Sequence, residues 1–517
     1  MDLRIRSFRQ AAFWSTAINA FSQLLSLVFS MVMAAVFGAQ ESTDVLYYCI
    51  GVFALLSGMF QAVNVNVLVP ETMRRRHQIG ELDAMAFINR FFAAFALLIA
   101  GLTAWILWNP AGTMTLISRF SAEALERNSR LVFWLLATLP LQMAAQLLLD
   151  VLVSYKFLTL PAALSCVNRI LNVAFVWLFH RQLGVLSVAL GMLLGFGLQV
   201  LLNLYLLRHA IRWRPLAWRT RVGGRVYRNV AWTELGTLAS TLAGYLPLFL
   251  FSGFSAGAMT ALNYARRLAS VPADLLTTQV SSVVGIKFNE LAARGEVDEI
   301  SRSFDRLCRA LVMVMVPLAF GLMLVSHGIT DILFGHGAFG PEAVREVAIL
   351  FGLLTLALPL GAMNFIVARM FIARQAISQA VPLQLAGSLL NAGSVYFCVR
   401  LWGVRGYPVG IFIFWCLYFL LLAWVMPRLF RLVSLWPSLG SWLRTMGACG
   451  VAAVGAWAVG RLAGIATWNP WLSAPAMLLL FTAFCAGLAA VRPPDRDALR
   501  YGLSVLKQVR SRKGEAK

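Results

Sequence analysis

The sequence predicts an all-α membrane protein with about 14 transmembrane helices, arranged as two six-helix lobes around a central cavity plus two extra C-terminal helices. Composition is the first reason. The 517 residues are 60% hydrophobic and 13% charged, with a mean hydropathy of +0.75. A soluble domain of this length could not bury so much apolar surface, so the composition indicates a polytopic membrane protein.

The charge distribution is the second reason. Seven Arg lie within 208–228, and long apolar stretches flank this segment on both sides. Such dense charge does not enter hydrocarbon, so we expect the segment to be cytoplasmic and to orient the spans around it. An even number of spans then places both termini in the cytoplasm, and we expect a multi-pass inner-membrane protein. The first apolar stretch, 10–37, is too long for a cleavable signal peptide.

Apolar stretches of about 20 residues, each enough for one crossing, recur along the chain. Polar or Gly-containing connections separate them. The predicted spans lie near 10–37, 44–69, 86–108, 131–154, 158–180, 183–207, 229–252, 258–285, 306–326, 346–368, 377–399, 403–427, 442–462 and 471–491.

An internal repeat predicts the two-lobed organisation. Gly-Glu-Leu-Asp at 80–83 lies between the second and third spans, and Gly-Glu-Val-Asp at 295–298 lies between the eighth and ninth. Matching positions of this kind are expected from a duplicated bundle. The predicted parts are an N-terminal lobe at 1–207, a basic cytoplasmic linker at 208–228, a C-terminal lobe at 229–428, two additional helices within 429–491 and a basic cytoplasmic tail at 492–517.

Other functional classes find little support in the sequence. The net charge of +22 suggests nucleic acid. However, the basic residues lie between apolar spans, where they act as topology signals and headgroup contacts, so we expect membrane lipids and no nucleic acid as partners. The His and Cys residues lack metal-ligand spacing, and no catalytic motif stands out. We therefore expect that the protein is not an enzyme and has no metal or cofactor. A coupling monovalent ion or the membrane potential is the candidate driving force.

Polar residues inside spans are the candidates for function, because each is costly to place in lipid. The span at 258–285 holds Asn263, Arg266, Arg267 and Asp274. One interpretation is a phosphate clamp, since the guanidinium fork binds phosphate oxygens bidentately and stays charged at neutral pH. The alternative is a structural ion pair between one of these Arg and Asp274.

Two other spans carry polar stripes at helical spacing. Such side chains either join helices by hydrogen bonds or line a hydrophilic cavity. The stripes are Gln142, Gln146 and Asp150 in the fourth span, and Asn168 and Asn172 in the fifth, with Arg169 beside them. Glu234 and Asn391 are candidates for binding a coupling cation, although a carboxylate near a span end is also explained by simple solvation.

Three segments resemble one known family. Phe37-Gly38-Ala39 followed by Thr43-Asp44 is similar to the FGA…TDA signature of the MviN/MurJ lipid II flippases. Tyr-Ala-Arg-Arg-Leu at 264–268, followed by Pro272, is similar to that family's YADRL…P segment. Leu333-Phe334, Gly337 and Phe339 resemble its LFxxGxF loop. The resemblance extends over residues 1–430.

This resemblance implies a member of the superfamily of polysaccharide flippases and multidrug (MATE) exporters. Such proteins alternate between inward-open and outward-open states. The expected cargo is a polyprenyl-pyrophosphate-linked saccharide. The resemblance implies a cavity role for Arg267 and assigns Asp44 to the acidic position at the start of the second span. The predicted substrate-binding set is Arg267, Arg266, Asp44, Asn263, Arg169 and Asp150.

The chain departs from the family pattern at cationic positions. Where the family has Arg in the first span, this chain has Gln23, Phe29 and Ser30, and Ser57-Gly58 stands where the second span has an Arg pair. Arg266 replaces the Asp of YADRL. With these departures, both lipid II and another such lipid, for example an exopolysaccharide repeat unit, are candidate cargoes. Glycan polymerases or glycosyltransferases are candidate partners.

Two further functions remain as alternatives. An ion-coupled exporter of amphipathic small molecules, as in the MATE branch, would use a carboxylate-rich cavity, for which Asp150 and Glu234 are the candidates. A membrane polymerase or ligase of glycans would need catalytic groups in large outer loops. The predicted outer loops are short except for 109–130 and 327–343.

Overall fold

The computed structural model describes residues 8–154, 160–208, 223–374, 376–430, 434–465, 468–491, 497 and 500. In this part of the chain the secondary structure is helical and no strand is assigned. By packing, the chain divides into two compact units. Unit 1 comprises Met1–Thr260 and Gly337–Phe339, and unit 2 comprises Ala261–His336 and Gly340–Lys517.

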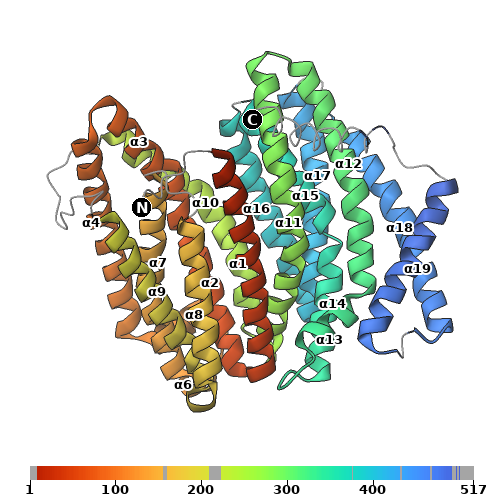
Figure 1. Ribbon diagram of the computed structural model, residues 1–517, viewed down its shortest axis with the longest axis horizontal. Helices are drawn as coiled ribbons and strands as arrows, with labels where there is room; N and C mark the ends of the chain where they lie inside the picture. Colours follow the sequence, from red (N-terminus) through yellow and green to blue (C-terminus); the bar gives the residue numbers. More distant parts are fainter. Residues whose placement is uncertain are drawn as a thin grey trace. The chain divides into compact units, whose positions relative to one another are not determined.

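Unit 1 is a bundle of long helices joined by short connections. Its elements are α1 (Phe8–Phe37), α2 (Glu41–Val63), η1 (Asn64–Leu68), α3 (Val69–Gln78), α4 (Glu81–Trp108), α5 (Pro110–Ile117), α6 (Ala122–Arg127), α7 (Ser129–Ser154), α8 (Leu160–Leu183), α9 (Leu186–Leu207) and α10 (Gly224–Phe251). α2 packs against α7 and α10, α9 packs against α7 and α8, and α8 packs against α1. Figure 1 shows α7, α8 and α9 running alongside one another.

One turn of this bundle departs from α-helical geometry. η1 is a π-helical turn that joins α2 to α3 without a break. A π turn inserts one extra residue into a helix, and such turns occur frequently at functional sites. It begins at Asn64, whose side chain is buried and bonded to α7.

Unit 2 is a second helical bundle built around α12. Its elements are α11 (Ala258–Ala293, continuous across residue 260), α12 (Val297–Leu324), α13 (Ser326–Phe334), α14 (Pro341–Thr355), α15 (Leu358–Ala373), α16 (Ile377–Trp402), η2 (Gly403–Arg405), α17 (Gly406–Leu429), α18 (Trp436–Leu462) and α19 (Pro470–Val491). α12 packs against α14, α15 and α18, and α18 pairs with α19, as the blue end of Figure 1 shows. Its fully buried Phe304, Met315 and Val316 share one apolar core with Leu360 and Ala456.

Small residues allow α16 and α17 to approach closely. Gly406 and Gly410 are four residues apart on α17 and face the α16 backbone. A Cβ on Gly406 would lie 2.0 Å from the carbonyl oxygen of Cys398, and one on Gly410 would lie 2.8 Å from the Cα of Val395. Backbone contact of this kind replaces the hydrophobic driving force that lipid cannot supply between helices.

The structure confirms the predicted class, an all-α protein that passes through the membrane many times. Eleven helical stretches in the described residues are long and apolar enough to span, or twelve if the bent pair α14 and α15 forms one span. The predicted number of 14 is not confirmed by this count, which treats Gln379–Leu429 as one stretch although it contains both α16 and α17. Large apolar side chains such as Leu97, Trp105 and Leu443 are exposed, as lipid-facing positions require.

The repeated Gly-Glu-x-Asp segments occupy equivalent places in the two units. Gly80 precedes α4 and Gly295 precedes α12, and both glycines have positive φ. Packing places α10 with α2 in unit 1, whereas the sequence assigned these residues to the second lobe. The predicted lobe boundaries remain predictions. Most of the linker at 208–228 and nearly all of the tail at 492–517 lie outside the described residues.

The start of α11 is held by a carboxylate from α2. Asp44, which is 4% exposed, accepts hydrogen bonds from the backbone amides of Gly257 at 2.6 Å and Thr260 at 2.8 Å. The Thr260 hydroxyl donates to the same carboxylate at 2.6 Å. The first amides of a helix have no partner within the helix and carry partial positive charge. Asp44 therefore acts as the N-terminal cap of α11.

The loop at 337–339, distant in sequence, packs against the same junction. The amide of Ala338 donates to the carbonyl of Ala35 at 2.8 Å. Gly337 has φ +67°, and a Cβ there would lie 2.1 Å from the Ala35 carbonyl oxygen, so only glycine fits. Gly38 has φ +65°, and a Cβ there would lie 2.4 Å from the carbonyl oxygen of Ala338. Two of the three segments singled out in the sequence, 37–44 and 333–339, thus contribute residues to one junction within unit 1.

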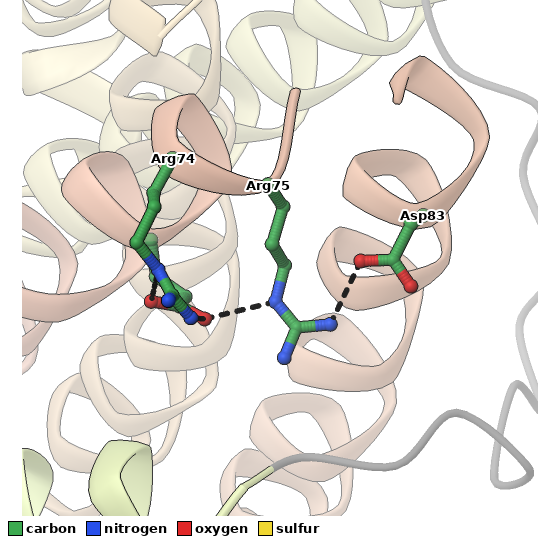
Figure 2. A network of polar contacts seen from close by, with 4 residues as sticks. Arg74, Arg75 and Asp83 are labelled. Carbon is green, nitrogen blue, oxygen red and sulfur yellow. Dashed lines mark hydrogen bonds and ion pairs between the residues drawn. The ribbon is translucent and has the colours of Figure 1, made fainter. Parts of the chain in front are cut away.

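A charged network fixes the α3–α4 turn (Figure 2). Arg75, whose side chain is 8% exposed, donates to Glu71 at 2.9 Å and to Asp83 at 3.0 Å. Its guanidinium also lies 4.6 Å from the ring centroid of Phe87. Arg74 shares Glu71 but is 45% exposed. Arg75 therefore joins α3 to α4, whereas the ion pair of Arg74 with Glu71 lies within α3.

Replacing Arg75 by Ala is expected to destabilise the protein by about 3 to 5 kcal/mol, because two carboxylates lose a buried partner. Arg74→Ala, the matched control on the same helix, is expected to cost about 1 kcal/mol or less, since exposed pairs contribute little. Thermal unfolding of the two purified variants in detergent measures the difference. Equal losses would show that Arg75 is not the anchor of this turn.

Asp44→Ala is expected to lower stability by about 1 to 3 kcal/mol for each donor left unsatisfied at the start of α11. Asp44→Asn keeps an acceptor oxygen and should lose less. Glu126→Ala, which removes an exposed carboxylate on α6, is the control and should leave the unfolding temperature nearly unchanged. An Asp44→Ala protein as stable as the wild type would contradict the capping role.

Candidate functional site

The predicted site residues fall into separate groups in the structure. Asp44 is buried, and both of its carboxylate oxygens accept hydrogen bonds at the start of α11. Its predicted contact with substrate remains a prediction. The bonds it makes are those of a structural cap, a role that the sequence pattern did not indicate.

Asp150 lies in a buried polar cluster between α2 and α7. Its two carboxylate oxygens accept one bond each, from the amide of Asn64 at 2.8 Å and from that of Gln146 at 3.2 Å. One turn of α7 before Gln146, Gln142 donates to the Ser57 hydroxyl of α2 at 3.2 Å. The predicted stripe on this span therefore faces α2. Asn64 was not in the predicted set, although it is identifiable by the same criterion, an amide inside a span.

The stripe on α8 faces α1 and α9. Arg169 is half-buried and donates to the backbone carbonyl of Ser22 in α1 at 2.7 Å. Asn168 donates to Gln199 of α9 at 2.8 Å, and Asn172 donates to Asn168 at 2.6 Å. Asn168 thus joins α8 to α9, which was one of the two interpretations of this stripe, whereas the bonds of Asn172 stay within α8. Arg169 remains the charged group of the stripe.

The first part of α11 carries the strongest candidates for anion binding. Asn263 and Arg267 are half-buried and one helical turn apart, so they share a face of the helix. Arg266 is exposed, and its guanidinium lies 5.8 Å from the ring centroid of Tyr407 on α17. This distance allows a cation–π contact that orients the Arg266 side chain. The side chain of Asp274, the alternative ion-pair partner, lies outside the described residues.

The two candidates for a coupling cation belong to different units. Glu234 is half-buried on α10 in unit 1. Asn391 is half-buried on α16 in unit 2, and its Oδ1 atom is buried without a hydrogen-bond partner among the described residues. In that part of the chain, no group of three or more His, Cys, Asp or Glu could hold a metal ion. The coupling-ion role of these residues remains a prediction.

Comparison with known proteins identifies the relatives of this chain. It is 25% identical over 421 residues to the lipid II flippase MurJ of Burkholderia cenocepacia, a match that covers 78% of this chain and 80% of that protein. It is 20% identical over 391 residues to a probable lipid II flippase MurJ of Rickettsia prowazekii, covering 73% of this chain and 76% of that protein.

Solved structures show the same fold. A lipid II flippase MurJ in an inward closed conformation has a TM-score of 0.76 at 15% identity, over 92% of this chain and 98% of that chain. A multidrug resistance MATE family transporter of the MOP superfamily, in an inward-facing conformation, has a TM-score of 0.61 at 15% identity, over 80% of this chain and 95% of that chain. At these identities the likeness concerns the fold alone.

The family model described as lipid II flippase MurJ matches residues 33–471. This range contains the start of α2, the arginines of α11 and the loop at 337–339, and so confirms the resemblance found in those three segments. The chain belongs to the MurJ family.

Proposed function

We propose that the protein is a flippase that carries a polyprenyl-pyrophosphate-linked saccharide from the inner to the outer leaflet of a bacterial inner membrane by alternating access. The family match over residues 33–471 carries the proposal. Lipid II is the first candidate cargo, as the names of the relatives indicate. The protein acts as a transporter and not as an enzyme, with both termini in the cytoplasm.

The physical task is to move a charged headgroup across about 30 Å of hydrocarbon. Polar side chains and water along the path lower the desolvation cost of the pyrophosphate, while the polyprenyl tail remains in lipid. Arg267 supplies the charge for this task, because its guanidinium binds phosphate oxygens bidentately and stays protonated. Asn263, on the same face of α11, offers an amide to the phosphate or the sugar.

Arg266 adds a second positive charge to α11. It stands where the family pattern has Asp, so this chain places two adjacent positive charges on the helix. In the first two spans, by contrast, Gln23 and Ser57 are neutral where the family pattern has Arg. This redistribution of charge keeps a second cargo in consideration, an exopolysaccharide repeat unit on the same lipid. Glycan polymerases or glycosyltransferases are then partners, and a monovalent ion or the membrane potential drives the cycle.

An ion-coupled exporter of amphipathic small molecules is the second candidate function. The fold shared with MATE transporters supports it as a related family. Two transport assays separate the candidates, because an exporter would confer resistance to cationic dyes, whereas a flippase would restore wall synthesis. The adjacent arginines of α11 favour an anionic cargo.

Arg267→Ala is expected to abolish rescue of bacterial cells depleted of their own lipid II flippase, while expression is retained. The loss of charge-assisted bonds worth about 1.5 to 3 kcal/mol corresponds to an affinity loss of about 10- to 100-fold. Arg267→Lys should restore rescue partly, since the charge remains and the planar fork is lost.

Arg302→Ala serves as the control, because Arg302 on α12 is 63% exposed and its ion pair among the described residues is with Glu299. This variant should rescue like the wild type. Full rescue by Arg267→Ala would contradict the clamp. Failure of the wild type itself, with correct membrane insertion, would exclude lipid II as the cargo and favour another lipid-linked glycan.

A further inference from the structure

Asp150 lies in a buried polar cluster of unit 1. Asp150 is 7% exposed and Asn64 is 1% exposed, so both lie inside the bundle of unit 1. Each carboxylate oxygen of Asp150 faces an amide NH2 group, from Asn64 at 2.8 Å and from Gln146 at 3.2 Å. Two neutral donors reduce the cost of a buried negative charge but do not cancel it.

Asn64 leaves one acceptor unused at this cluster. Its Nδ2 donates to Asp150, whereas its Oδ1 is buried and has no hydrogen-bond partner in the described part of the chain. A buried acceptor without a donor is rare in folded proteins, because it loses its water without replacement. Asn64 also begins the π-helical turn η1. The cluster therefore holds one unsatisfied acceptor beside one carboxylate.

No cation neutralises Asp150 among the described residues. Arg169 on α8 donates to a backbone carbonyl, and Arg75 on α3 is occupied by Glu71 and Asp83. Neither contacts Asp150, whose bonds are to Asn64 and Gln146. The other charged or titratable groups on α7 and the helices packed against it are Glu41, Asp44, Tyr47, Tyr48, Cys49, Arg74, Arg76, His77, Glu81, Arg90, Glu123, Glu126, Arg127, Arg130, Cys166, His180, Arg181 and Tyr205.

We propose that Asp150 and Asn64 form a proton-binding site inside unit 1, which takes up and releases a proton during the transport cycle. Its role in the cycle rests on the proposed flippase function. A proton from water binds Asp150 Oδ2 and neutralises the carboxylate. The Asn64 amide then rotates by half a turn, so that Oδ1 accepts the new O–H group. On release, the proton returns to water and Nδ2 again donates to the carboxylate.

The geometry favours a proton over a metal cation. A sodium ion would need several oxygen ligands directed at one point, as hard cations do. Here both carboxylate oxygens are approached by N–H donors, which repel a metal ion. An amide, however, exchanges donor for acceptor by rotating, so it can serve both protonation states of Asp150. Sodium binding is therefore an outcome that would overturn the proposal.

The first test detects the proton directly. Infrared spectra of the purified full-length protein in lipid nanodiscs are recorded over a pH series, with and without sodium. As the pH falls, the carboxylic-acid carbonyl absorption of all carboxyl groups should rise, and its Asp150 component should be missing from the difference spectrum of Asp150→Asn but remain in Glu126→Gln, which alters an exposed carboxylate on α6. In Asn64→Leu the Asp150 component should appear at higher pH, because the carboxylate loses a donor. No Asp150-dependent band, or one abolished by sodium, would overturn the proposal.

The second test concerns the cycle. Transport of a lipid-linked saccharide in proteoliposomes should depend on a pH gradient in the wild type. Asp150→Asn should abolish that dependence, and Asn64→Leu should shift it. An unchanged pH dependence in Asp150→Asn would overturn the role in the cycle. Absence of transport by the wild type would count against the flippase function, while the infrared test still decides whether Asp150 binds a proton.

Discussion

Lipid offers no hydrogen-bond partner, so each polar group within a span must find one in the protein or in water. This constraint organises unit 1. Asp150 of α7 bonds to Asn64 of η1, Asn168 of α8 bonds to Gln199 of α9, and Arg169 bonds to α1. Apolar side chains can slide against one another with little change in energy, but these bonds cannot. The polar groups therefore specify which helix faces meet in a chain that is mostly apolar.

The same constraint acts at the start of α11. Its first amides are buried, and Asp44 supplies the acceptors that the helix itself lacks. The cap thus satisfies the backbone at the start of the helix within unit 1. Gly337 completes the junction by allowing backbone contact with Ala35 that no side chain would permit.

Charged side chains are distributed unevenly along the chain, so that α11 suits anion binding and the Asp150 cluster suits proton binding. α11 carries two adjacent arginines, which suit a pyrophosphate. Inside unit 1, Asp150 is surrounded by neutral amides, which suit a proton. A negatively charged cargo and a site that binds a proton both move charge during a transport cycle. This movement of charge responds to the membrane potential.

The sequence by itself determined the membrane class, the helical fold, the family and a set of candidate polar residues, because hydropathy and motif spacing are properties of the local sequence. It could not determine the partner of each polar residue. The sequence did not indicate that both oxygens of Asp44 cap α11, and Asn64 could be paired with Asp150 only once η1 was placed against α7. Such pairings join residues 86 to 216 positions apart, and only tertiary packing decides which of many polar groups meet.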